Sequence, residues 1–177
     1  EAFAPLSAAF DLIVVDAPCS GEGMFRKDPF ARAQWSDALV EQCAVLQAGI
    51  IDSAWKLLKP SGHLIYCTCT WEPRENEHHI ERLIHQGAEH LPIPFDPAWG
   101  MVDSGPGLRC YPHRVKGEGL FIAALRKPGQ RQQDVRRIAQ HGSLDGPFTT
   151  WVKEPERQHF SEHDGLVHAL SSRWTDH

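Results

Sequence analysis

The sequence has no apolar stretch that approaches the length of a membrane-spanning segment, and no signal-peptide pattern opens it. Its 177 residues, 41% of them hydrophobic, suffice for one medium-sized core and part of a second. The five cysteines are an odd number, and their spacing is not that of a secreted disulfide framework. We therefore expect a protein of the reducing cytoplasm without a membrane span.

An excess of positive charge is also missing. Lysine and arginine total 18 against 23 aspartates and glutamates, which gives a formal net charge of -5. This balance argues against a protein that holds nucleic acid through bulk charge. Local basic groups remain at Arg26-Lys27, at Arg114 with Lys116, and between Arg126 and Arg137. Each is either solvated surface or part of a basic path toward a cleft.

The first strong structural signal is the apolar run Leu12–Val15, which is rich in β-branched residues. Such a run predicts a strand that is buried on both faces, as in parallel sheets. Pro18 removes a backbone donor and ends the strand, so Asp16 and Cys19 lie just past its carboxyl end. Ligands bind at that edge of open α/β sheets, so a carboxylate and a thiol there indicate a functional site. Because the chain starts at Glu1 without methionine and meets this strand almost at once, we also expect a fragment of a longer protein.

Helix and strand patterns alternate further along the chain. Asp28 before Pro29, and Ser36 before Asp37, are typical of helix starts. Steps of three and four residues then predict one helix face, formed by Leu39, Cys43, Leu46, Ile50, Ala54 and Leu57. Further predictions are strands at His63–Thr70 and Leu120–Leu125, a helix at Glu75–Gln86, at most an edge strand at Leu91–Phe95, and a loop at Asp96–Gly107. This order indicates an α/β fold with right-handed crossovers and a parallel sheet.

The composition changes after this region. Residues 128–147 are polar and basic and are typical of a linker. Residues 148–177 contain too few apolar side chains for a core of their own. We therefore expect a first domain at 1–127, a linker at 128–147, and at 148–177 the start of an accessory domain or an extension.

Three segments resemble motifs of one enzyme family. They are Asp16–Lys27 (DAPCSGEGMFRK), Thr68-Cys69-Thr70 followed by Asn76-Glu77, and the stretch Arg109–Ala123 with its Pro112-His113 pair. They resemble motifs IV, VI and VIII of the RNA cytosine-C5 methyltransferases, the NOL1/NOP2/Sun family. The first segment is most similar to the RsmF-like branch, which methylates small-subunit ribosomal RNA.

The resemblance implies a Rossmann-like methyltransferase fold, mostly parallel with an antiparallel last strand, and covers its carboxy-terminal half from Phe10 to Lys127. The family's glycine-rich donor loop, its neighbouring lysine and its ribose-binding acid all precede motif IV and have no counterpart in this sequence. The resemblance further implies S-adenosylmethionine as cofactor, ribosomal RNA or the small ribosomal subunit as partner, and a monomer. We expect the chain alone to be inactive, because half of the donor pocket is missing.

The resemblance also implies roles for individual residues. Cys69 is the expected nucleophile that adds to C6 of cytosine, and Cys19 is expected to help release the product. Asp16 is expected to hydrogen-bond the N3/N4 edge of the base or, with Pro18, to contact the methyl donor. Thiols suit this chemistry because a thiolate is strongly nucleophilic near neutral pH and also leaves well. RNA contacts are implied for Arg26, Lys27, Arg109 and His113, the last two being alternatively holders of the site loop.

Other interpretations compete with these roles. Free cysteines are often core residues, which is our interpretation of Cys43 and Cys67. Periodicity does not separate Cys67 from Cys69, and only the Thr-Cys-Thr match and the position at the end of the strand favour Cys69. A metal site at Cys67, Cys69, His78 and His79 is a rival, but adjacent histidines on one helix do not readily face one ion, so no metal is expected. The alternative function is a non-catalytic RNA- or ribosome-binding module that kept the fold.

Overall fold

The computed structural model describes residues 6–130, 146–163 and 165–171. The chain divides into two compact units, Glu1–Arg131 and Gln132–His177. Most of the predicted linker at 128–147 lies outside the described residues. Among the helices of the described ranges, none is both long and apolar enough to cross a membrane.

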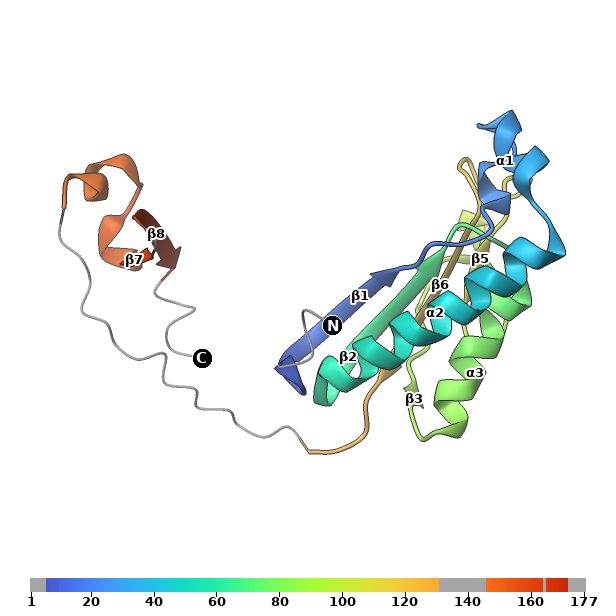
Figure 1. Cartoon of the computed structure of the whole chain (residues 1–177), viewed down its shortest axis with the longest axis horizontal. Helices are drawn as coiled ribbons and strands as arrows, with labels where there is room; N and C mark the ends of the chain where they lie inside the picture. Colours follow the sequence, from blue (N-terminus) through green and yellow to red (C-terminus); the bar gives the residue numbers. More distant parts are fainter. Residues whose placement is uncertain (1–5, 131–145, 164, 172–177) are drawn as a thin grey trace. The chain divides into compact units, whose positions relative to one another are not determined.

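The first unit is built around a mixed sheet (Figure 1). Strands β1 (Phe10–Asp16) and β2 (Leu58–Thr68) are parallel neighbours, and β6 (Leu120–Arg126) pairs with β2 in the antiparallel direction. The short strands β3 (Glu89–His90), β4 (Val102–Asp103) and β5 (Leu108–Cys110) extend the sheet beyond β6. The α/β fold and the antiparallel strand at Leu120 are thus confirmed. The described part of the sheet holds more antiparallel pairing than expected, because these short strands pair on the β6 side.

Two helices cover one face of this sheet. Helix α2 (Asp37–Leu57) and helix α3 (Glu77–His85) bury side chains in the same core as alternate residues of β1, β2 and β6. The aromatic rings of Tyr66 and Phe121 are fully buried and meet edge to face at a centroid distance of 6.4 Å. Such pairs add a little to the stabilisation that burial alone provides. The core therefore fixes β2 between β1 and β6, with its carboxyl end beside that of β1.

The start signals for the helices are confirmed. Asp28 accepts a hydrogen bond from the Phe30 amide and begins helix α1 (Pro29–Gln34), while Ser36 accepts one from Leu39 and begins α2. The short 3₁₀ helices η2 (Glu22–Met24) and η3 (Pro73–Glu75) precede α1 and α3. The prediction that the third helix begins at Glu75 is wrong, because Asn76 leaves the helical conformation and separates η3 from α3.

The prediction that the first strand is buried on both faces is wrong for the described residues. Val15 is buried, whereas Leu12 and Val14 on the opposite face are 54% and 59% exposed. The sheet ends at β1, and the described helices cover only the other face. An apolar run indicates that both faces of a strand are suited to burial. It does not identify the segment that covers each face.

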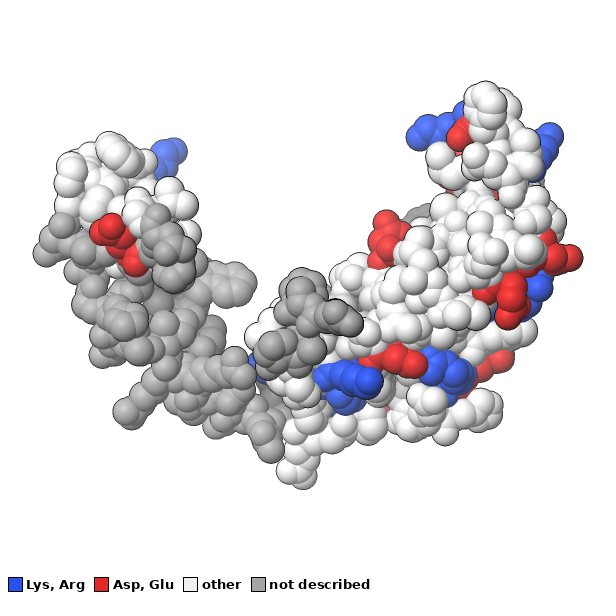
Figure 2. Space-filling view, viewed as in Figure 1, with Lys and Arg blue, Asp and Glu red and all other residues white. Residues whose placement is uncertain are grey.

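The apolar stripe of α2 also differs from the prediction. The helix buries Val40, Gln47, Ile51 and Ala54, while Leu46 of the predicted stripe is 53% exposed. Leu46 instead lines an open apolar groove between α2 and β1, together with Ile13, Val15, Ile50 and Leu57. Figure 2 shows few charged side chains over this part of the unit. The helix is therefore apolar on a broader face than the described sheet covers.

Two further predictions need correction. Residues 91–95 form no strand; the short strand β3 lies just before them, since Pro92 and Pro94 cannot donate ladder hydrogen bonds. The region 96–107, predicted as loop, contains the 3₁₀ helix η4 (Pro97–Trp99) and β4.

The second unit contains the antiparallel strands β7 (Gln158–His163) and β8 (Leu166–Ser171), preceded by η5 (Pro147–Trp151) and η6 (Pro155–Arg157).

Candidate active site

Two cysteines meet where β1 and β2 end. Asp16 lies opposite Cys67 in the parallel register, so the segments that follow both strands leave the sheet at the same edge. The sulfur atoms of Cys19 and Cys69 lie 3.2 Å apart, a distance at which one thiol hydrogen-bonds to the other. Both side chains are half-buried. The structure thus brings together the two thiols that the sequence singled out, although 50 positions separate them.

The contact between the two sulfur atoms gives the two thiols different pKa values. The hydrogen bond from Cys19 lowers the pKa of the Cys69 thiol from 9.0 to about 7, against the opposing effect of burial. The pKa of Cys19 is raised, first by its bond to Cys69 and then by burial. Cys69 is therefore the thiol of the pair that ionises first, near neutral pH, and its thiolate accepts a hydrogen bond from the Cys19 thiol. This form presents one nucleophilic sulfur and keeps a proton beside it.

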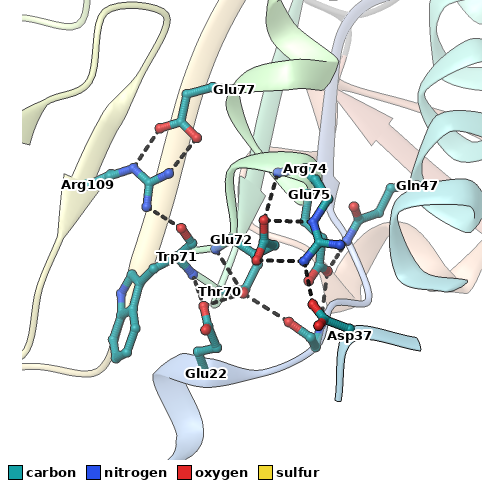
Figure 3. A network of polar contacts seen from close by, with 11 residues as sticks. Glu22, Asp37, Gln47, Thr70, Trp71, Glu72, Arg74, Glu75, Glu77 and Arg109 are labelled. Carbon is teal, nitrogen blue, oxygen red and sulfur yellow. Dashed lines mark hydrogen bonds and ion pairs between the residues drawn. The ribbon is translucent and has the colours of Figure 1, made fainter. Parts of the chain in front are cut away.

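The loop after β1 is fastened to the segment after β2 (Figure 3). The carboxylate of Glu22 accepts hydrogen bonds from the Thr70 hydroxyl at 2.9 Å and from the Trp71 amide at 2.8 Å. The amide of Gly23 donates to the Cys69 carbonyl at 2.6 Å. A Cβ atom at Gly23 would collide with that carbonyl, so glycine is required for this close approach.

A buried polar network lies behind the two loops. Gln47 from α2 and Glu75 from η3 have no exposed surface, and their side chains hydrogen-bond at 2.8 Å. The Thr68 hydroxyl donates to the Asn76 side chain at 2.6 Å, and Asn76 in turn donates to the Thr70 carbonyl at 2.9 Å. Sequence reasoning missed these residues as parts of the site. The available signal was Gln47, a polar residue on the same helix face as Val40, Ile51 and Ala54.

Asp16 ends β1, and Pro18 lies in the segment between that strand and Cys19. Both side chains are exposed, and the Asp16 carboxylate accepts a weak hydrogen bond from Cys67 at 3.8 Å. Burial, followed by the charge of Asp16, raises the pKa of Cys67. Cys67 is therefore the neutral neighbour of the site, whereas Asp16 keeps an oxygen surface open to a bound molecule.

The four predicted RNA-contact residues occupy different environments. Arg26 and Lys27 are exposed in the segment before α1, and Arg26 donates to the Gly117 carbonyl at 2.6 Å. Lysine and arginine side chains flank the end of the unit that carries α1 (Figure 2). His113 is also exposed, and its ring stacks on Tyr111 at a centroid distance of 5.5 Å.

Arg109 differs from the other three because it is only 6% exposed. Its guanidinium makes two hydrogen bonds to the Glu77 carboxylate, the first at 2.6 Å, and a third at 2.6 Å to the Trp71 carbonyl (Figure 3). A buried bidentate pair of this kind fixes geometry. Of the two roles considered for Arg109, its position favours that of holding the loop after Cys69.

The residues of the rival metal site point to different partners. The Nε2 atom of His79 lies 3.2 Å from the Gln47 amide oxygen, while His78 is exposed. Cys69 faces Cys19, and Cys67 faces Asp16 and the Val15 carbonyl. In the described ranges no three His, Cys, Asp or Glu side chains are grouped so that they could hold a metal ion.

The first unit is similar to known proteins over most of its length. A family model described as 16S rRNA methyltransferase RsmB/F matches residues 3–126. Ribosomal RNA small subunit methyltransferase F from Erwinia tasmaniensis is 38% identical over 127 residues, which are 69% of this chain and 27% of that protein. The protein of the same name from Escherichia coli is 41% identical over 123 residues, which are 67% of this chain and 26% of that protein.

Solved structures show the same relationship. The structure of NSun6 from Pyrococcus horikoshii with SFG is 30% identical with a TM-score of 0.55, and the similarity covers 67% of this chain and 30% of that one. The chain spans only about a quarter of the length of the two curated relatives, 27% and 26%. The fold is that of the Rossmann-like methyltransferases. The chain belongs to the 16S rRNA methyltransferase RsmB/F family.

Proposed function

We propose that this chain forms part of an enzyme that methylates C5 of a cytosine in small-subunit ribosomal RNA. The observation that carries the proposal is the contact of Cys19 and Cys69 at 3.2 Å, at the carboxyl ends of two parallel strands. Ligands of open α/β sheets bind at this edge. The names of the curated relatives support ribosomal RNA as the substrate class.

Cys69 supplies the nucleophile in this proposal. Its thiolate adds to C6 of the cytosine, which moves an electron pair toward C5 and makes that carbon reactive toward an electrophilic methyl group. Loss of the C5 proton to a base then returns the electron pair and expels the Cys69 thiolate. The Cys19 thiol donates a hydrogen bond to the departing sulfur and so stabilises the thiolate that leaves. The same contact therefore prepares the nucleophile and assists product release.

S-adenosylmethionine supplies the electrophilic methyl group when it is bound. The NSun6 relative was solved with SFG, an analogue of this donor. In the present chain, exposed Asp16 and Pro18 fit a place beside the donor, because a carboxylate attracts a positively charged sulfonium centre. The Asp16 carboxylate is equally accessible to the N3/N4 edge of the base, which is the other role considered for it.

We further propose that residues 1–127 are the carboxy-terminal half of the catalytic domain of a longer methyltransferase of the cytoplasm, and that residues 148–177 are the start of an accessory domain or an extension. The short coverage of the relatives supports this, as does the apolar surface left open beside β1. RNA approaches along Arg26, Lys27 and His113, while Arg109 holds the loop after Cys69.

The test is a pair of cysteine substitutions in the longer protein, assayed with labelled donor and ribosomal RNA. We expect Cys69→Ala to abolish methyl transfer, because the sulfur that adds to C6 and thereby activates C5 is removed. We expect Cys19→Ala to leave a covalent complex of RNA and protein that survives denaturing gel electrophoresis. Normal turnover by Cys69→Ala would remove the nucleophile assignment, and absence of methyl transfer in the unsubstituted protein would favour a non-catalytic RNA-binding module.

A further inference from the structure

The peptide groups on both sides of Cys19 form hydrogen bonds with two buried side chains, Gln47 and Glu75. The Pro18 carbonyl, just before Cys19, accepts a hydrogen bond from Gln47 Nε2 at 2.8 Å. The Ser20 amide, just after it, donates to Glu75 Oε2 at 3.0 Å. Gln47 Nε2 also donates to the same Glu75 oxygen at 2.8 Å, which closes the arrangement. Cys19 therefore sits in a backbone segment tied at both ends to α2 and η3.

The buried position of Glu75 lowers the stability of the fold. Its side chain has no exposed surface, and its second oxygen, Oε1, has no hydrogen-bond partner among the described residues. The hydrogen bonds to Oε2 come from neutral groups, Ser20 and Gln47. A buried carboxylate without a cationic partner destabilises a fold relative to an apolar side chain of similar size. Stability of the core alone therefore gives no reason for a carboxylate here.

The Gln47 amide also contacts a third buried residue. His79 Nε2 lies 3.2 Å from Gln47 Oε1, and burial lowers the pKa of His79 to about 4. The Pro18 carbonyl and Glu75 Oε2 both accept hydrogen bonds, so the amide nitrogen of Gln47 must face them, and its oxygen is left to accept from a neutral His79 ring with the proton on Nε2. A series of contacts thus links His79 of α3 to Gln47 of α2, and Gln47 to the backbone around Cys19.

We propose that Gln47 and Glu75 are positioning residues that hold Cys19 within hydrogen-bond distance of Cys69. The proposal rests on the proposed function for the role of Cys19 in product release, but the positioning itself is a property of this chain. Loss of the Gln47 amide leaves the Pro18 carbonyl unpaired and frees one side of the Cys19 segment. The Cys19 thiol then drifts from the Cys69 sulfur, and product release slows while the first methyl transfer continues.

The direct test measures proximity in the chain itself. Diamide takes two hydrogens from a pair of nearby thiols, becomes a hydrazine and leaves a disulfide, and peptide mass spectrometry identifies which cysteines are joined. We expect Gln47→Met to slow formation of the Cys19–Cys69 disulfide by about tenfold or more, since correct placement governs such rates. Gln42→Met is the matched control, because Gln42 is exposed on the same helix, and it should react at the unsubstituted rate. Equal rates in the two variants would overturn the proposal.

Folding is checked first by urea unfolding of each variant. Should Gln47→Met not fold, Gln47→Asn replaces it, because its amide is one methylene too short to reach both acceptors, and the same loss is expected. The second readout uses the longer protein, where Gln47→Met should accumulate the covalent RNA complex and Gln42→Met should not. A purely structural effect would lower the folded fraction without changing the ratio of trapped complex to released product.

The two proposals fail in different ways. Slow disulfide formation in Gln47→Met, together with normal turnover by Cys69→Ala, would leave the positioning intact and remove the proposed function. Unchanged disulfide formation and unchanged product release in Gln47→Met, together with an inactive Cys69→Ala, would remove only the positioning role.

Discussion

Identical side chains acquire different properties at the edge of this sheet. Cys19 and Cys69 form one hydrogen bond, and this bond lowers the pKa of Cys69 and raises that of Cys19. Cys67, two positions before Cys69, faces Asp16, and its pKa is raised by burial and by that carboxylate. Sequence periodicity places Cys67 and Cys69 on the same side of a strand, and their different contacts in three dimensions give the two thiols different pKa values.

The close approach of Gly23 to the Cys69 carbonyl predicts how substitution of this glycine changes stability. A methyl group there would collide with the Cys69 carbonyl and with the Gly119 backbone, so Gly23→Ala should destabilise the chain by about 2 kcal/mol. Gly49, within α2, has open space where a methyl group would stand, so Gly49→Ala should stabilise the chain by about 0.5–1 kcal/mol. Urea unfolding of both variants checks this. Similar effects of the two substitutions would contradict the close packing of Gly23 on the Cys69 segment.

At the scale of the elements, the structure explains which sequence signals succeeded. The caps Asp28 and Ser36 are local, since each side chain bonds to an amide two or three residues away, and both helix starts were predictable. The boundary between η3 and α3 was not, because Asn76 leaves the helix to bond with Thr68 and Thr70 in another segment. Gln47 was equally hidden, because its partners lie in the loop after β1 and in η3.

Helix α3 also makes the stability of the chain depend on pH. Burial, followed by the charges of Arg82 and His78, lowers the pKa of His79 from 6.5 to about 4. The unfolded chain binds a proton near pH 6.5 and the folded chain only near pH 4, so stability is complete above 6.5 and falls as the pH drops toward 4. The loss attributable to this group is about 3 kcal/mol.

His79→Gln separates this contribution from those of other groups. Glutamine keeps a donor for Gln47 and does not titrate, so the variant should lose less stability than the unsubstituted chain between pH 6.5 and pH 4. Urea unfolding at a series of pH values gives both curves. Parallel curves would show that His79 is not held neutral by its surroundings.

At the scale of the whole chain, the apolar surfaces of the first unit are incompletely covered. Leu12 and Val14 are exposed on one side of β1, and Leu46 lines an open groove on the other. The sequence predicts all three side chains to be buried, and it could not reveal that the described residues leave them exposed. The α/β class was predictable from the order of local patterns, whereas coverage depends on segments far away in the fold.

This incomplete surface leads to a prediction about the methyl donor. Only Asp16 and Pro18 of the described residues are candidates to contact S-adenosylmethionine, and both are exposed at the open end of β1. We expect the chain alone to bind the labelled donor more weakly than micromolar and to transfer no methyl group. Equilibrium dialysis with labelled donor measures this, with the longer protein as control. Micromolar binding by the chain alone would show that it already contains a complete donor pocket.

The pH dependence of alkylation tests most directly whether Cys19 activates Cys69, on which the proposed chemistry depends. The rate at which iodoacetamide modifies Cys69 is followed by peptide mass spectrometry from about pH 5 to about pH 10, in the unsubstituted chain and in Cys19→Ala. We predict a half-maximal rate near the pKa of about 7 and a midpoint displaced upward toward 9.0 in Cys19→Ala, because the hydrogen bond that lowers the pKa is lost. A midpoint near 9.0 in the unsubstituted chain, or the same midpoint in both proteins, would contradict this activation.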